Sequence, residues 1–191
     1  MKYILLISMV FWGLPALGQS FCNGSVPLTT FDARFDVDLA DPSYVTDLAT
    51  GLEWQRCTYG YELNDNEGDT DISNHTCDLV DQDEDGVSDN QILFRWYDAV
   101  ETVSSIGDGW RLPNIKELNT IVETGCVSPA INTNIFPSAF SSAYWTNTPS
   151  STHVSFNNGS HFAGVWVIDF SSGDDTTASK GSALLIRLVR D

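Results

Sequence analysis

One stretch, GDGWRLPNIKEL at residues 107–118, constrains the fold of this chain more than any other. Apolar residues at helical spacing lead into it from Trp96 to Ile106, which predicts an amphipathic helix. Asn114 is a favourable N-cap for a second helix, and Glu117 occupies the capping-box position. We therefore expect two helices close together at mid-chain. The apolar stripe of the first helix comprises Trp96, Ala99, Val100, Val103 and Ile106.

Segments typical of strands lie on both sides of these helices. Alternating or continuous apolar residues, bounded by turn residues, predict short strands there. Strands that flank two central helices favour an α+β fold with an antiparallel sheet over a βαβ repeat. The predicted strand segments are residues 35–39, 44–46, 52–55, 143–146, 164–170 and 183–190.

The first eighteen residues resemble an export signal. Lys2 supplies the positive start, an apolar run follows from Tyr3 to Leu14, and Ala16-Leu17-Gly18 forms a cleavage site similar to Ala-x-Ala. The apolar run is short for a membrane-spanning helix. We expect cleavage after Gly18, a secreted or periplasmic location, a single domain at residues 19–191, and no transmembrane segment after cleavage.

The charge of the chain narrows the class of partner. The formal net charge is −17, and loss of Lys2 with the signal would make it one unit more negative. A surface of this sign repels nucleic acid and anionic lipid. We expect cations, basic surfaces or neutral glycans as partners, with no nucleic acid.

Four cysteines, at positions 22, 57, 77 and 126, follow the predicted signal. An even number in an exported chain predicts two disulfides, and the count alone allows three pairings. There is no Cys-x-x-Cys pair, which argues against a thiol redox site or a cysteine-rich zinc site.

Residues 61–90 differ in composition from the rest of the chain. Eleven Asp and Glu lie between Glu62 and Asp89, with no Lys or Arg among them. Apolar residues are scarce, so the stretch cannot form a core of its own. We predict an acidic insertion or long loop carried by the domain, and loops of this length are usually functional or disordered.

Within the insertion, the sequence DQDEDGVSD predicts a calcium loop. Carboxylates at Asp81, Asp83 and Asp85, the carbonyl of Val87 and the acid Asp89 have the required spacing, with a glycine at the sharp turn. The usual final glutamate is missing, because an isoleucine stands there. The alternative is a solvated acidic loop that binds no metal.

Aromatic side chains are the candidates for contact with a ligand. Tyr61, Tyr144 and Trp145 could stack on sugar faces, as could Tyr59 and Trp166, although strand aromatics more often pack in the core. No motif of a nucleophile elbow, zinc protease, P-loop or dinucleotide site is present. The sequence therefore favours a protein without catalysis. An enzyme such as a hydrolase ranks third, after a binding domain and a structural module of the envelope.

Four blocks of sequence resemble the C-terminal-domain family of the Legionella collagen-like protein. They are VTDLATGLEWQRC, WRLPNIKELNTIVE, CVSPAINTNIFP and SALLIRLVR, at residues 45–57, 110–123, 126–137 and 182–190. The resemblance implies a secreted, C-type-lectin-like domain with roles in adhesion and polysaccharide binding. It also implies disulfides Cys57–Cys77 and Cys22–Cys126. The named relative binds sulfated glycans through a basic surface, whereas this chain is acidic, so we expect a different ligand unless calcium bridges the two anions.

These observations predict a secreted, non-catalytic binding domain that recognises extracellular polysaccharide or a cell-surface protein, with calcium supporting the acidic loop. The alternative is a structural or assembly module of the cell envelope without a small ligand. The resemblance also implies that the chain could form a homo-oligomer, since the named relative trimerises.

Overall fold

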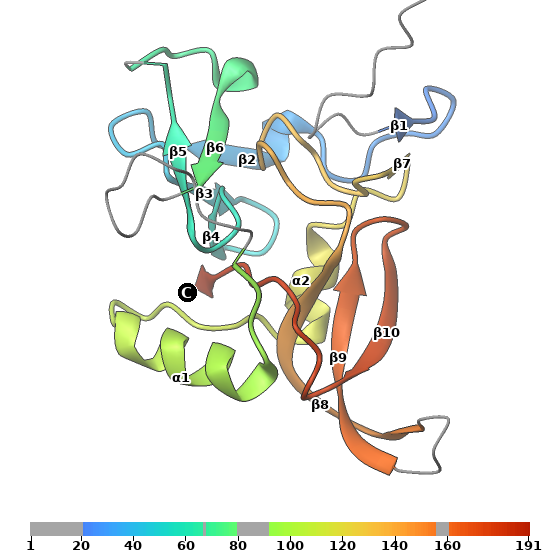
Figure 1. Ribbon diagram of the computed structural model, residues 1–191. Coiled ribbons are helices and arrows are strands. Elements are labelled where there is room, and N and C mark those ends of the chain that lie inside the picture. The colour runs from blue at the N-terminus through green and yellow to red at the C-terminus, as the bar shows by residue number, and fades with distance from the viewer. Residues whose placement is uncertain (1–20, 67, 80–91, 156–160) are drawn as a thin grey trace, which may run out of the picture.

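The computed structural model describes residues 21–66, 68–79, 92–155 and 161–191 (Figure 1). In these ranges the chain forms an α+β fold in which two α-helices accompany antiparallel strands, as the sequence predicts. No helix within the described residues is long and apolar enough to cross a membrane. The predicted signal, residues 1–18, lies outside the described residues.

A four-stranded antiparallel sheet has the strand order β11-β4-β3-β2. Val45 lies opposite Trp54, and Trp54 lies opposite Val189, so three fully buried side chains form a row across the sheet. The first and last parts of the chain thus meet in one sheet. The strands are β2 (Phe35–Val37), β3 (Tyr44–Asp47), β4 (Glu53–Gln55) and β11 (Val189–Arg190).

A three-stranded antiparallel sheet has the order β10-β9-β8 and contains the longest strands. Gly173, at the turn between β9 and β10, has a φ of +87°, and a Cβ there would lie 2.9 Å from a Val122 side-chain atom. This close approach requires glycine. The strands are β8 (Ala143–Ser155), β9 (His161–Asp169) and β10 (Asp174–Ser179). The sequence did not indicate β10.

The two predicted helices are present as α1 (Trp96–Ile106) and α2 (Ile115–Thr120). The side chain of Asn114 accepts hydrogen bonds from the N–H groups of Lys116 and Glu117, and that of Glu117 accepts from the N–H of Asn114. The capping box is therefore confirmed. The predicted stripe of α1 is correct at Ala99 and Val103, which are buried, and wrong at Val100, which is 40% exposed.

Two hydrophobic clusters form the core, and the β8–β9 pair contributes to both. One face of the pair carries Tyr144 and Ile168 towards α2 and the four-stranded sheet. The other face carries Trp145 and Val167 towards α1. Because both faces are covered, neighbouring residues of β8 are buried together.

The closing segment is buried as predicted but is mostly not a strand. Leu185, Ile186 and Leu188 are fully buried, while only Val189 and Arg190 pair in a ladder. Leu184 makes an isolated bridge to Phe94. The apolar run therefore fills the core between elements instead of pairing along its length.

Two disulfides fix the periphery, with the pairing that the family resemblance implied. Cys22–Cys126 joins β1 (Phe21–Cys22) to β7 (Cys126–Val127), and these two strands pair with each other. Cys57–Cys77 joins the segment after β4 to a hairpin.

The first part of residues 61–90, predicted as an acidic insertion or long loop, contains two strands and is therefore not a simple loop. Strands β5 (Tyr61–Asn64) and β6 (Thr76–Leu79) form an antiparallel hairpin around a 3-10 turn, η2 (Ile72–Asn74). His75 and Cys77 are buried against the body of the domain, so a few well-placed residues anchor an otherwise polar stretch. A second 3-10 turn, η1 (Asp32–Arg34), precedes β2.

Candidate functional site

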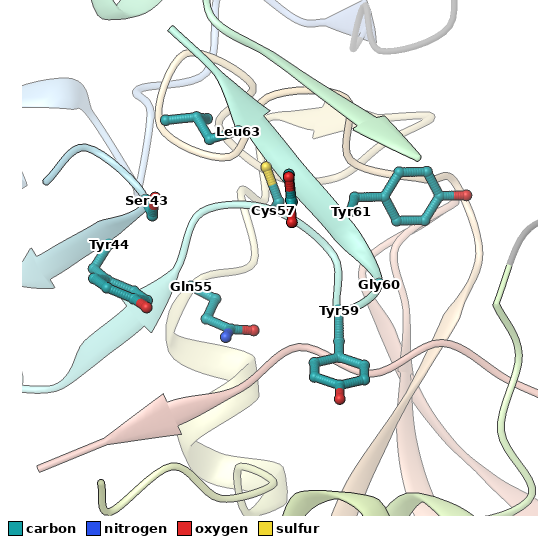
Figure 2. Close-up of a pocket in the computed structure, with 9 residues that line it drawn as sticks. Ser43, Tyr44, Gln55, Cys57, Tyr59, Gly60, Tyr61 and Leu63 are labelled. Carbon is teal, nitrogen blue, oxygen red and sulfur yellow. The ribbon is translucent and has the colours of Figure 1, made fainter. Parts of the chain in front are cut away.

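A groove of about 530 Å³ lies between β3, β4 and the start of β5 (Figure 2). The chain forms it by passing from β4 through a short connection into the hairpin, so most of the lining is contiguous in sequence. The side chains of Tyr44 and Gln55 lie on one side of β5, whereas that of Tyr61 extends on the other side (Figure 2). The lining residues are Ser43, Tyr44, Gln55, Cys57, Tyr59, Gly60, Tyr61, Glu62 and Leu63.

Tyr44 is held by a stack of aromatic and guanidinium groups. Its ring centroid is 4.9 Å from that of Trp110, and the guanidinium carbon of Arg190 lies 4.4 Å from the Trp110 ring centroid. Arg190 is itself ion-paired with Glu53, and this hydrogen bond raises the pKa of Arg190. The stack fixes the orientation of the Tyr44 ring at one end of the groove.

The other two tyrosines are also supported by rings behind them. The Tyr59 and Phe94 centroids are 5.7 Å apart in an edge arrangement, and those of Tyr61 and Phe140 are 5.1 Å apart. Burial raises the pKa of Tyr61, and the charge of a neighbouring tyrosine adds to the effect, so its hydroxyl stays protonated over a wide pH range. Three half-buried tyrosines with fixed rings thus border the groove.

Several polar groups of the groove have no hydrogen-bonding partner in the described part of the chain. These are the hydroxyls of Ser43, Tyr44 and Tyr59 and the side-chain amide of Gln55. The backbone of Gln55, in contrast, is fully engaged: its N–H donates to the Leu188 carbonyl at 3.1 Å. The main chain is therefore rigid where the side-chain groups are free to bind a ligand.

Two buried arginines hydrogen-bond to the backbone at or next to lining residues of the groove. Arg56 donates to the carbonyls of Ile135 at 2.8 Å and Pro42 at 3.0 Å, and burial lowers its pKa to about 10. Arg187 donates to the carbonyl of Gln55 at 2.8 Å, and burial lowers its pKa as well. These guanidinium groups satisfy buried carbonyls at the end of β4 and in the irregular backbone at Pro42 and Ile135.

His75 of the hairpin completes this network. Its Nδ1 lies 3.0 Å from Nη1 of Arg56, and its Nε2 lies 3.0 Å from the carbonyl oxygen of Asp69. Since a guanidinium can only donate, Nδ1 accepts and Nε2–H donates. His75 and the disulfide Cys57–Cys77 together tie the hairpin to Arg56 and to the lining residue Cys57.

The structure brings one of the three predicted ligand-binding aromatics to the site. Tyr61 borders the groove. Tyr144 and Trp145 are 1% and 0% exposed, so the prediction that they are available to a ligand is wrong. The hydroxyl of Tyr144 lies 2.7 Å from the Thr58 hydroxyl, and the indole N–H of Trp145 donates to the Phe94 carbonyl. Their polar atoms are used inside the core.

Sequence reasoning missed Ser43, Tyr44 and Gln55. Tyr44 was assigned only to a strand, and nothing in its period distinguishes a ring at the surface from one in the core. The predicted calcium ligands Asp81, Asp83, Asp85, Val87 and Asp89 lie outside the described residues. Among the described residues, no group of three or more His, Cys, Asp or Glu side chains is placed to hold a metal ion.

Fold and groove together define a disulfide-tied α+β domain whose groove presents tyrosines, an amide, hydroxyls and one carboxylate. The chain belongs to the Lcl C-terminal domain family, whose model matches residues 43–190. The match begins at the first residue of the groove and excludes the arm that contains β1 and β2. Comparison with curated proteins gives no match.

Proposed function

We propose that this chain is an exported, non-catalytic binding domain that recognises extracellular glycan through the groove of Tyr44, Gln55 and Tyr59. The observation that carries the proposal is the set of free hydroxyl and amide groups beside rigidly supported rings. Sugars offer hydroxyls for such groups and apolar C–H faces for aromatic rings. The same groove would bind a cell-surface protein through the glycan that this protein carries.

Membership of the Lcl C-terminal domain family supports two further parts of this proposal. We infer a C-type-lectin-like arrangement, which is consistent with two helices, antiparallel sheets and two disulfides. We also infer export, because two disulfides suit an oxidising compartment. An experimental structure superposed on a C-type lectin tests the first inference, and N-terminal sequencing of the mature protein tests the second.

Calcium support of the acidic segment is a proposal from the sequence alone. The spacing of Asp81, Asp83 and Asp85 carries it, and an extracellular site of this kind has a Kd of ~10⁻⁴ to 10⁻³ M. Calorimetric titration with calcium should give binding heat that is lost in Asp83→Asn. If several millimolar calcium produced neither heat nor a change in stability, the proposal would be rejected.

A structural or assembly module of the envelope is the second candidate. Phe21 and Val127 lie opposite each other on β1 and β7 and are 60% and 46% exposed, as suits an apolar contact with another protein. This candidate predicts no glycan binding and retention of the protein in envelope fractions.

A glycan array probed with residues 19–191 separates these candidates. We expect binding to a limited set of glycans, followed by calorimetry on the strongest of them. Gln55→Ala and Tyr59→Phe each remove one polar partner and should weaken binding threefold to tenfold, since a hydrogen bond contributes ~0.5–1.5 kcal/mol. Tyr97→Phe is the matched control, because Tyr97 lies on α1 with 63% of its surface exposed. Silence across the array, or equal losses in Tyr59→Phe and Tyr97→Phe, would refute binding through this groove.

A further inference from the structure

The described lining of the groove is acidic as well as aromatic. Glu62 is the one charged residue among the lining residues, and it projects from β5 with an exposed side chain. Its carboxylate accepts no hydrogen bond from another described residue. A ligand that fills the groove therefore meets one uncompensated negative charge.

A second carboxylate increases the charge at this point. Glu62 lies opposite Asp78 in the β5–β6 pair, and like charges directly opposite each other destabilise a strand pair. Asp78 accepts a hydrogen bond from the Asn64 amide at 2.9 Å, which orients Asp78 but brings no positive charge. A cation bound beside Glu62 would relieve this repulsion.

None of the described Lys or Arg residues neutralises this pair. Arg190 borders Tyr44 but is committed to Glu53, and Arg56 and Arg187 are buried on backbone carbonyls. The other ion pairs are Arg34–Asp47 and those of Arg111 with Glu117 and Asp191. Arg95, Lys116 and Lys180 belong to the two helices and the turn after β10. Among the described residues, no Lys or Arg is thus paired with Glu62 or Asp78.

We infer that the groove binds a glycan that carries free amino groups, with an ammonium beside Glu62 and the sugar ring against the tyrosines. This inference rests on the proposed function and specifies its ligand class. A sulfated or uronic sugar would place its anion against Glu62, where no cation receives it. A bare metal ion fits less well, because calcium takes six to eight oxygen ligands and the described residues offer no cluster of three.

Oligomers of glucosamine and of N-acetylglucosamine provide a matched pair of probes. They share the sugar backbone and differ in whether the nitrogen is charged. Calorimetry on residues 19–191, at mildly acidic pH and low salt, should show threefold to fivefold tighter binding of the glucosamine hexamer, the range expected for a partly exposed ion pair. Higher salt should reduce this preference.

The variant Glu62→Gln should remove the preference, so that the glucosamine and N-acetylglucosamine hexamers bind to it with equal affinity. Glu101→Gln is the matched control: it makes the same change of charge on an exposed residue of α1, and the preference should persist. A loss of the preference in both variants would show a general effect of net charge and would overturn the assignment of the ammonium to Glu62.

The remaining outcomes distinguish this inference from the proposed function. Equal binding of the two hexamers by the unmodified chain would overturn the preference for amines and leave glycan recognition standing. Absence of binding to the glucosamine hexamer would also overturn it, whereas glycan recognition itself depends on the array. Hexalysine is the last probe. If it bound as tightly as the glucosamine hexamer and lost affinity equally in Glu62→Gln, the site would recognise positive charge and not sugar, and the inference would be overturned.

Discussion

The buried carboxylate of Glu123 offers a strong test of how the N-terminal arm is held. Only 1% of this residue is exposed. One carboxylate oxygen accepts from the N–H of Thr30 at 2.7 Å and from its hydroxyl at 2.9 Å. The other accepts from the N–H groups of Thr29 at 3.1 Å and Gly125 at 2.9 Å. We predict that Glu123→Gln, which preserves size and shape, destabilises the protein by about 3 kcal/mol at neutral pH.

This magnitude follows from the contacts. An amide has one acceptor oxygen, so its NH₂ group replaces the oxygen that faces Thr30. The Thr30 hydroxyl can turn and accept from the amide, but the buried N–H of Thr30 loses its acceptor, at ~1–3 kcal/mol. The contacts of the other oxygen change from charge-assisted to neutral, which weakens each by ~0.5–1 kcal/mol.

The pH dependence provides the second half of this test. Burial raises the pKa of Glu123, but its hydrogen bonds to Gly125, Thr30 and Thr29 outweigh burial and hold the pKa below its usual value. The stabilisation is therefore complete above the unfolded pKa of ~4.3 and is lost as the pH falls through the lower folded pKa. Urea unfolding of the unmodified chain and of Glu123→Gln should show this difference in the free energy of unfolding at pH 7. The difference should disappear under strongly acidic conditions.

Glu101→Gln, on the exposed face of α1, is the control and should change stability by less than ~0.5 kcal/mol. The reasoning is refuted if Glu123→Gln lies within that same range at pH 7, or if its deficit does not change with pH.

Three further predictions concern buried residues near the groove. Arg56→Met should lower the free energy of unfolding by ~2–4 kcal/mol, because the carbonyls of Ile135 and Pro42 lose their donors. Relief of the desolvation of a buried charge offsets only part of this loss. Denaturant titration measures the change, and unchanged stability would contradict the prediction. Replacing both Cys57 and Cys77 with alanine should lower the free energy of unfolding by ~3 kcal/mol, since the disulfide closes a loop of 20 residues. It should also weaken glycan binding. Thermal unfolding and calorimetry measure the two effects, and unchanged affinity would show that the disulfide does not support the groove. Tyr144→Phe should lower stability by ~1–2 kcal/mol through loss of the Thr58 contact, whereas a direct loss of glycan affinity without a change in stability would restore the hydroxyl as a ligand contact.

The two helices and the start of α2 could be predicted because their signals are local. Asn114 and Glu117 make the capping box that their spacing indicates, since both partners lie within one helical turn. Trp110 and Leu112, which precede this cap, are buried at 8% and 3% exposure. The length of α2 was less predictable, because the helix ends at Thr120 after six residues and no glycine or proline follows there directly.

The hairpin at β5–β6 shows where composition misleads. Its acidic residues correctly indicate that it has no core of its own. Yet His75 reaches Arg56, and Cys77 bonds to Cys57, so the hairpin is held by the body of the domain. Both contacts join residues that are about twenty positions apart, and composition carries no information on such pairs.

The sequence by itself determined the class of fold, the helix caps and, through family resemblance, the disulfide pairs. Tertiary structure decided which aromatics reach the surface. Tyr44 and Tyr144 both stand in predicted strands, but β8 is covered on both faces, whereas β3 leaves one face towards the groove. The period of a strand states which residues share a face. What covers that face depends on segments that are distant in the sequence, such as those of Trp110 and Arg187, and their positions are fixed only when the whole core closes.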